Sequence, residues 1–138
     1  MLPGVRVLLT GHGSDVGRLV KLDLLNAGHV IRLFGGSILD KDTVVRQVRH
    51  VDALVHVDFL DDFSSSSFPQ LVSYNVGGTI HLAEAAEQRE VPMAFWTPPS
   101  SGQAERTLKM AAQVAVDEYG AHRVKSLDDI VAWVERHG

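Results

Sequence analysis

The sequence contains no cysteine, which excludes disulfide bonds and thiol catalysis. This absence fits a reducing compartment, and we predict a cytoplasmic location. No apolar run approaches the roughly 20 residues that cross a bilayer, and MLPGVRVLLTG lacks the long apolar core of a signal peptide, so neither a membrane anchor nor export is predicted. The formal charge is −4 with both signs spread along the chain, so no basic patch predicts a nucleic-acid partner.

Metal ligands are also missing, because the seven histidines show no spacing such as H-x-x-x-H and no metal site is predicted. Internal repeats are absent, and the only low-complexity patch is Ser64 to Ser67. With 138 residues, of which 45% are hydrophobic, the chain is large enough for a core of its own. We therefore predict one domain that spans residues 1–138.

Two kinds of apolar segment alternate along the chain. Short runs rich in β-branched residues predict strands, and longer segments with apolar residues three and four positions apart predict amphipathic helices. The predicted strands cover residues 5–9, 29–34, 52–59 and 91–97, and a short segment at 122–125 precedes the last helix. The predicted helices cover residues 15–28, 41–51, 71–90, 104–120 and 127–138, and a polar loop is expected at 60–70.

Alternation of strands and helices predicts parallel pairing with helices on both faces of the sheet. We therefore expect a doubly wound α/β sheet of about five parallel strands. Ligands of such sheets bind at the carboxyl ends of the strands. The loops that follow residues 9, 34, 57 and 97 should then meet in one crevice.

Four segments resemble one family, the extended short-chain dehydrogenases/reductases, also known as the NAD(P)-dependent epimerase/dehydratase group. VRVLLTGHGSDVGRLV resembles its TGxxGxxG opening, VDALVHVDF its D-x-V-V-H-L-A-A strand, and YNVGGTIHLAEAA its N-V-x-G-T-x-x-L-L-E-A-A helix. AERTLKMAAQVAVDEYG is similar to the helix that carries the family's Y-x-x-x-K pair. The resemblance covers residues 5 to 120. It implies a Rossmann-like domain, NAD or NADP as cofactor, and a small-molecule ligand.

The glycine loop departs from the family's spacing. The family places glycines at positions that correspond to 11, 14 and 17, whereas this chain has Gly11, Gly13 and Gly17, with Ser14 between them. Ser14 puts a Cβ atom where the pyrophosphate should pass, although its hydroxyl could donate a hydrogen bond and Gly13 could supply the missing room. Asp15, in the first helical turn, would take the place of an anion. The loop is either a dinucleotide site formed by these five residues or a turn without a ligand.

The adenosine half of the predicted site is shortened. A dinucleotide site has an acid about 20 residues after the glycines, for the ribose hydroxyl. This chain has Phe34, Gly35 and Gly36 there. Of the two aspartates in the family's G-D-[IL]-x-D segment, Ser37 replaces the first and Asp40 keeps the second. Asp40 is therefore the remaining candidate contact on this side of the cofactor.

The catalytic pair of the family is only half present. Lys109 matches the lysine, but Glu105 stands where the tyrosine should be, and the two form an i,i+4 pair that is also favoured on ordinary helix surfaces. Ser100 lies near the family's serine after a small shift in register, and Asn75 matches its asparagine. Asp58, after the third strand, is either a recruited acid or base or a cap of the following loop. His56 matches a family histidine that is expected to be structural.

Three functional interpretations remain open. The first is a shortened member without hydride transfer that binds a nucleotide or acts as a dimeric binding or regulatory protein. The second is an active NAD(P)-dependent reductase or epimerase. The third is a cofactor-independent enzyme in which Asp58, Glu105 and Lys109 converge as acid/base groups. The family's C-terminal substrate lobe is expected to be absent from this chain.

A homodimer is predicted from the two long helices. In the family the helices that match 71–90 and 104–119 pair across a twofold axis as a four-helix bundle. Both segments carry wide apolar faces here, and one face alone would cover the sheet. The residues on which this prediction rests are Leu71, Val72, Val76, Ile80, Leu82, Leu108, Ala111, Ala112 and Ala115.

Overall fold

The computed structural model describes residues 4–61 and 67–138. Within these residues the chain forms a five-stranded parallel sheet in the order β2-β1-β3-β4-β5. The predicted doubly wound α/β fold is confirmed. Residues 62–66 of the expected polar loop, which include residues 64–66 of the serine patch, lie outside the described residues. The strands are β1 (Arg6–Leu9), β2 (Val30–Leu33), β3 (Ala53–His56), β4 (Met93–Phe95) and β5 (His122–Arg123).

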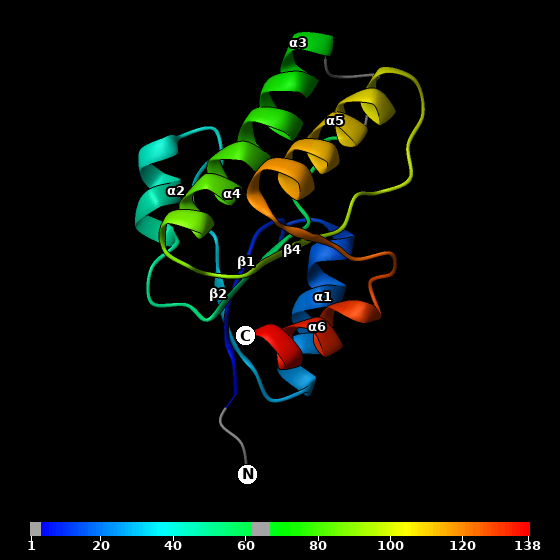
Figure 1. The fold of residues 1–138 in the computed structure, drawn as a ribbon. Coiled ribbons are helices and arrows are strands. Elements are labelled where there is room, and N and C mark those ends of the chain that lie inside the picture. Colours follow the sequence, from blue (N-terminus) through cyan, green and yellow to red (C-terminus); the bar gives the residue numbers. More distant parts are fainter. Residues whose placement is uncertain (1–3, 62–66) are drawn as a thin grey trace.

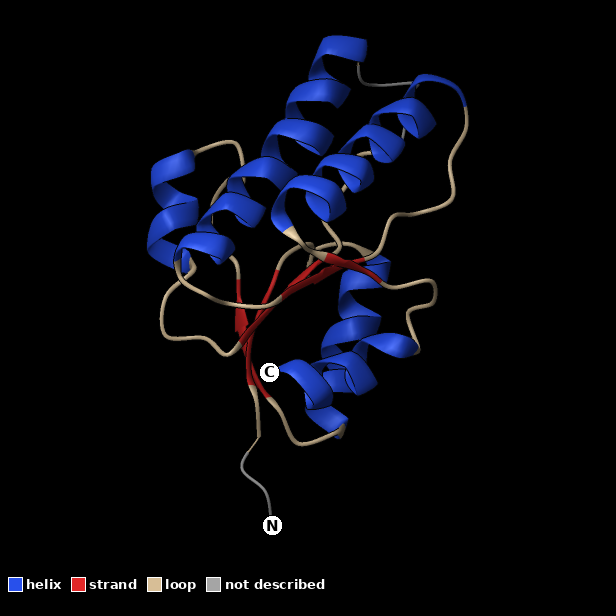
Figure 2. Cartoon of the chain, viewed as in Figure 1, coloured by secondary structure: helices blue, strands red, loops and turns tan. Residues whose placement is uncertain are grey.

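Helices cover both faces of the sheet (Figures 1 and 2). The helices α1 (Asp15–Asn26) and α6 (Asp129–His137) pack on one face. The other face carries α2 (Lys41–Gln47), α4 (Gly78–Gln88) and α5 (Gly102–Tyr119). This arrangement leaves the carboxyl ends of the strands uncovered, and the loops that carry the candidate site lie there.

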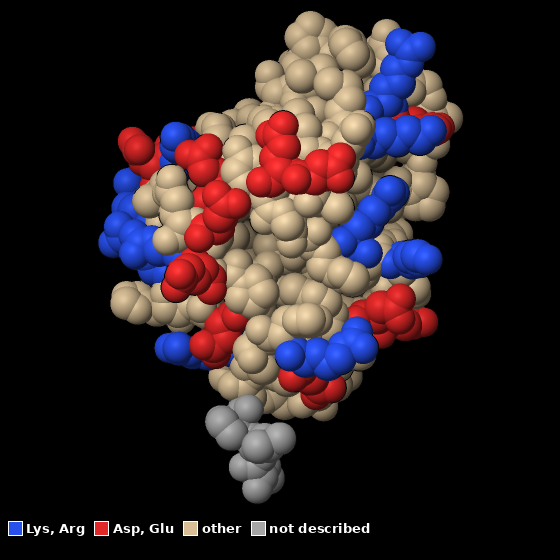
Figure 3. Space-filling view, viewed as in Figure 1, with Lys and Arg blue, Asp and Glu red and all other residues tan. Residues whose placement is uncertain are grey.

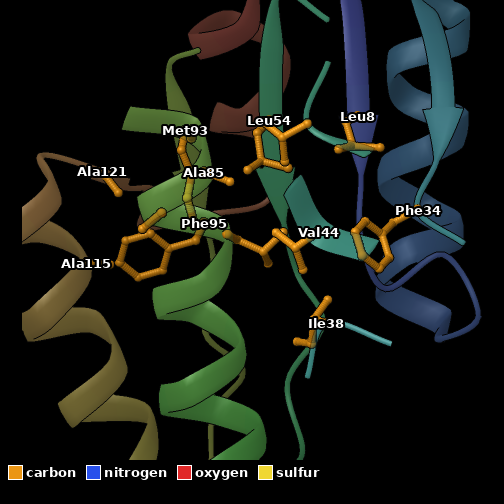
Figure 4. Packing of buried hydrophobic residues seen from close by; sticks show 14 of the residues in the cluster. Leu8, Phe34, Ile38, Val44, Leu54, Ala85, Met93, Phe95, Ala115 and Ala121 are labelled. Carbon is orange, nitrogen blue, oxygen red and sulfur yellow. The ribbon is translucent and has the colours of Figure 1, made fainter. Parts of the chain in front are cut away.

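Each face of the sheet has its own hydrophobic core, because successive side chains of a strand point to opposite sides. Val7 and Leu9 lie in the core under α1 and α6, whereas Leu8 lies in the core under α2, α4 and α5. Figure 4 shows this second core, where Leu8 and Leu54 from the sheet lie near Val44 of α2. Each fully buried leucine contributes about 1.5–3 kcal/mol. Continuous apolar strands are therefore what this sheet requires.

The predicted helix 71–90 is built from three consecutive elements. It begins with α3 (Phe68–Leu71), which Ser67 caps by accepting a hydrogen bond from the Gln70 amide. A π-helical turn, η1 (Val72–Gly77), follows, and α4 continues from there. Of the two glycines expected to weaken the helix, Gly77 thus ends a wide turn and Gly78 begins α4. Such a turn is an insertion often found at functional sites.

One face of α1 exposes a row of leucines. The helix buries Gly17, Val20 and Leu24, and it leaves Leu19 56% and Leu22 54% exposed, with Leu25 on the same side at 44%. These three positions are spaced by three residues and therefore lie on one side of the helix.

No helix in residues 4–61 and 67–138 has the length and apolar character needed to cross a bilayer.

Candidate functional site

A cavity of about 290 Å³ opens at the carboxyl ends of β1, β2 and β3. The loop between β1 and α1 forms one wall, and the residues that follow β2 and β3 form the others. The loops after β1, β2 and β3 meet here as predicted, but the loop that follows residue 97 does not, because it lines a second cavity described below. Its lining residues are Gly11, His12, Gly13, Ser14, Phe34, Gly36 and Asp58.

Sterics require two of the three loop glycines. Gly11 has a φ of 78°, and a Cβ there would lie 2.9 Å from the carbonyl of Val57. A Cβ on Gly17 would lie 1.8 Å from the carbonyl oxygen of Gly11, so the helix packs against its own loop. Around Gly13, in contrast, a Cβ would meet no atom within 4 Å among the described residues. Gly13 therefore adds open space on the cavity wall rather than fitting a tight contact.

Ser14 caps α1. Its hydroxyl oxygen accepts a hydrogen bond from the Gly17 amide at 3.0 Å and donates one to the Gly11 carbonyl at 2.8 Å. This bonding holds the loop in shape and satisfies one amide of the helix N-terminus.

The prediction that Asp15 occupies the position of a bound anion is wrong, because Asp15 lies outside the cavity. Its side chain is 98% exposed and pairs with Arg18 at 3.4 Å. The first helical turn directs this carboxylate into solvent, because the capping role that would turn it toward the amides belongs to Ser14. The amides at the start of α1 are thus not covered by Asp15.

Asp40 is the N-cap of α2 rather than a residue of the cavity wall. Its carboxylate accepts hydrogen bonds from the amides of Asp42 and Thr43, at 3.1 and 3.3 Å. Hydrogen bonds hold the pKa of Asp40 below its ordinary value, and those from Thr43 lower it more than the one from Asp42 does. A helix start after Asp40 was predictable from the sequence, and the cap explains the residue without a cofactor.

Asp58 lies in the first cavity and forms a short hydrogen bond with Tyr74 of η1. The Tyr74 hydroxyl donates to Asp58 Oδ2 at 2.7 Å. Burial raises the pKa of the Asp58 carboxyl, and the Tyr74 hydrogen bond and the nearby His12 only partly oppose this rise. Burial and the Asp58 carboxylate together raise the pKa of Tyr74.

Sequence reasoning missed both neighbours of Asp58. Tyr74 precedes the recognised asparagine by one position and lies on the π-helical turn, from which it reaches Asp58. His12 lines the cavity, and its Nδ1 atom is buried without a hydrogen-bond partner among the described residues. No pattern in the sequence indicated either role.

His56 is fully buried at the end of β3 and is structural, as expected. Its two ring nitrogens hydrogen-bond the hydroxyls of Thr10 and Thr79, at 2.7 and 3.0 Å. Burial lowers its pKa to about 3, so the ring stays neutral. The residue joins β1, β3 and α4 below the crevice.

A second cavity, of about 480 Å³, lies between the end of β4 and α5. It brings together Ser100, Glu105 and Lys109, three of the predicted catalytic residues. Lys109 Nζ lies 2.8 Å from Glu105 Oε1, and both side chains are partly exposed. Asp58 lines the first cavity instead, so the three acid/base candidates are divided between two cavities. The other lining residues are Trp96, Thr97, Pro98, Pro99, Leu108, Arg123 and Lys125.

Asn75 is buried and lines neither of the two cavities described. Its amide oxygen accepts from the Leu60 amide at 2.7 Å, and its amide nitrogen donates to the Leu60 carbonyl at 2.8 Å and to the Thr107 hydroxyl at 2.9 Å. The side chain thus ties the loop after β3 to α5. No group of three or more His, Asp and Glu side chains in the described part of the chain is placed to hold a metal ion.

Solved structures with this architecture are numerous. A short-chain dehydrogenase/reductase superfamily protein from Agrobacterium tumefaciens with bound NAD matches 86% of this chain with a TM-score of 0.74 and 17% identity. The dTDP-4-dehydrorhamnose reductase of Bacillus anthracis, in complex with NADP, matches 89% of the chain with a TM-score of 0.74 and 14% identity. The fold is that of the extended short-chain dehydrogenases/reductases. The resemblance seen in the sequence is confirmed at this level.

Comparison of sequences gives a weaker match, to a dehydrogenase. A uronate dehydrogenase from Pseudomonas syringae pv. tomato is 28% identical over an alignment 105 residues long, and the match covers 64% of this chain and 38% of that protein. No family model matches the chain. The chain spans about half the length of the solved structures above, with 47% and 52% of their residues covered.

Proposed function

We propose that the protein is a shortened relative of the extended short-chain dehydrogenases/reductases that binds a nicotinamide dinucleotide without transferring hydride. The glycine-loop cavity carries this proposal. Gly11 and Gly17 keep the tight packing between the loop and the helix, Ser14 holds the loop, and Gly13 leaves open space on the wall. Backbone amides at the start of a helix attract phosphate groups. The two matched structures that contain NAD and NADP support the same ligand class.

The side chains at the second cavity argue against hydride transfer. In the family's chemistry a tyrosinate removes a hydroxyl proton as hydride leaves. Glu105 stands at that position and is bound to Lys109 at 2.8 Å. A carboxylate is a far weaker base than a tyrosinate. The pair therefore has the form of a helix-surface ion pair rather than of a proton acceptor for an alcohol.

Thermal unfolding with NAD, NADH, NADP and NADPH tests the proposal. One of the four nucleotides is expected to stabilise the protein by about 2.7 kcal/mol when present at 100 times its dissociation constant. The absorbance of the nicotinamide should stay constant when alcohols or sugars are added to the complex. Failure of all four to raise the melting temperature at millimolar concentration would refute nucleotide binding. Nicotinamide reduction by any of the added compounds would refute the absence of hydride transfer.

Asp58 is expected to weaken the binding of a nucleotide, because it adds a negative charge to the cavity that would hold the pyrophosphate. Asp58→Asn should tighten binding of the nucleotide about fivefold, which corresponds to about 1 kcal/mol for a partly screened charge. Asp15→Asn removes the same charge from an exposed position outside the cavity and should change the affinity little. Isothermal titration calorimetry on the three proteins measures the difference. Equal effects of the two substitutions would contradict a specific role of Asp58.

The same residue should give the protein a pH dependence. Burial raises the pKa of Asp58 in the folded state above the ordinary value of 3.8. Between the two pKa values the folded protein therefore binds more protons than the unfolded chain. Protonated Asp58 thus contributes to the free energy of unfolding at pH values below 3.8, and this contribution is lost as the pH rises through the raised pKa. Urea unfolding at a series of pH values measures the effect, and the free energy of unfolding of Asp58→Asn should not show this loss. If the free energies of unfolding of the two proteins change in parallel with pH, the prediction is contradicted.

We also propose a homodimer through the outer sides of α4 and α5. Leu71, Leu82 and Leu108, on which the sequence argument rested in part, are already buried within one chain. Met110 and Val116 of α5 remain exposed, so this helix carries apolar side chains outside the core of one chain. Light scattering after size exclusion should give twice the chain mass of 15.1 kDa, and Met110→Glu should reduce it to that value. A mass of one chain for the unaltered protein would refute the dimer.

A further inference from the structure

We propose that the second cavity binds a small organic anion through Arg123 and Lys125. Three cationic side chains line this cavity, Lys109, Arg123 and Lys125, against one carboxylate, that of Glu105. The local excess of positive charge contrasts with the chain's net charge of −4. Figure 3 shows several Lys and Arg side chains down the right-hand side of the molecule, where α5 and the segment after it lie in Figure 1.

The backbone directs the side chains of Arg123 and Lys125 to the same side of the chain. Arg123 ends β5 and Lys125 follows two residues later, whereas Val124 between them is buried in the core under α1 and α6. Alternate residues of an extended segment point the same way. Arg123 and Lys125 are therefore both directed out of the core, and both reach the cavity wall.

Arg123 is oriented by a neighbouring strand end. Its guanidinium donates to the Thr97 hydroxyl at 2.9 Å, which holds it over the segment that follows β4. One such bond leaves several of the five N–H groups of a guanidinium for a ligand. The fixed, planar group is suited to a carboxylate or phosphate, which it can bind through two parallel hydrogen bonds.

The charge on this side is not neutralised by protein carboxylates. Glu105 is 2.8 Å from Lys109, so that pair is internally balanced. Within residues 4–61 and 67–138, neither Arg123 nor Lys125 lies within 4.0 Å of a carboxylate oxygen. An anion that enters the cavity would meet two cations with no competing partner in this part of the chain.

The remaining walls define the rest of the ligand. Trp96, Leu108 and Pro98 add apolar surface to the cavity lining, and its volume of about 480 Å³ suits a small molecule. The ligand class is thus a carboxylate or phosphate attached to a ring or short carbon skeleton that packs on Trp96. This cavity shares no lining residue with the glycine-loop cavity, so the inference does not depend on nucleotide binding.

Two tryptophans make the inference testable by NMR on the whole chain. Trp96 lines the cavity, whereas Trp133 is buried in the core under α1 and α6, does not line the cavity and serves as an internal reference. Gluconate and glucose 6-phosphate are titrated at fixed ionic strength into nitrogen-15-labelled protein, with uncharged glucose as the control. We expect the indole resonance of Trp96 to shift saturably with at least one anion and that of Trp133 to stay in place. The two anions distinguish carboxylate from phosphate recognition.

Substitution of the cations completes the test. Arg123→Gln combined with Lys125→Gln should weaken binding of the effective anion about tenfold or more, as expected when charge-assisted hydrogen bonds are removed. Arg106→Gln, an exposed cation of α5 outside the cavity lining, should leave the affinity unchanged. An unshifted Trp133 resonance shows that each variant is folded. The inference is overturned if neither anion gives a saturable shift at millimolar concentration, if glucose acts as strongly, or if both substitutions weaken binding equally.

Discussion

Gly17→Ala is expected to lower the free energy of unfolding by about 3 kcal/mol, and the melting temperature by about 10 °C. The added Cβ would lie 1.8 Å from the Gly11 carbonyl oxygen and 2.8 Å from the His12 Cα, and both are backbone atoms. No side-chain rotation can relieve such a contact, so α1 and the loop must move apart. Since the loop forms the wall of the first cavity, nucleotide binding should be lost with the stability.

Gly13→Ala is the matched control for this substitution. It adds the same methyl group to the same loop, where no described atom lies within 4 Å. Its free energy of unfolding should stay within about 0.5 kcal/mol of the unaltered protein. Gly13 also lines the cavity, so its alanine variant separates occupation of ligand space from distortion of the loop. Urea unfolding measures both variants, and equal stabilities would show that the helix does not depend on the close approach of Gly17 to Gly11.

Asn75→Ala should be the second strongly destabilising change, with a loss of about 3 kcal/mol. The substitution leaves the amide and carbonyl of Leu60 and the hydroxyl of Thr107 without their side-chain partner. Each buried polar group left unpaired costs about 1–3 kcal/mol, although water that enters the new space recovers part of this. The loop after β3 should loosen, and with it the position of Asp58.

Ser73→Ala provides the comparison for Asn75, because Ser73 lies on the same π-helical turn and is exposed. Its free energy of unfolding should change by less than about 0.5 kcal/mol. Denaturant unfolding followed by circular dichroism measures the two variants side by side. If Asn75→Ala proves as stable as Ser73→Ala, the hydrogen bonds of Asn75 do not hold the loop.

The elements that the sequence predicted well are those whose pattern follows directly from burial. The strand around Leu8 is a continuous apolar run because helices cover both faces of the sheet, and β1 occupies four of its five predicted residues. The π-helical turn was not predicted. Asn75, whose side chain hydrogen-bonds the distant Thr107, lies within this turn, and no local pattern in the sequence indicates the wider hydrogen bonding. Gly77 and Gly78 signalled an irregularity but not its kind.

In the candidate site, too, the features that follow from local backbone geometry were predictable, and those that depend on tertiary structure were not. The steric roles predicted for Gly11 and Gly17, a tight turn and close packing of the helix, agree with the backbone geometry, and their contact with a cofactor stays a prediction. Asp15 and Asp40 were taken for cofactor contacts, but a helix start gives each of them a simpler place, since one is exposed in the first turn and the other is a cap. Arg123 reaches its cavity only through the pairing of β5 with β4, which no local pattern records.

The leucine row on α1 has a consequence for how the stability measurements are best made. Leu19, Leu22 and Leu25 present apolar surface on the folded protein. Fluorescent dyes that report unfolding do so by binding such surface, so they should bind here before any unfolding and start from a high background. Trp133, 3% exposed in the core between α6 and the sheet, becomes solvated only when that core opens. Intrinsic tryptophan emission is therefore the better-suited signal for every melting experiment on this protein.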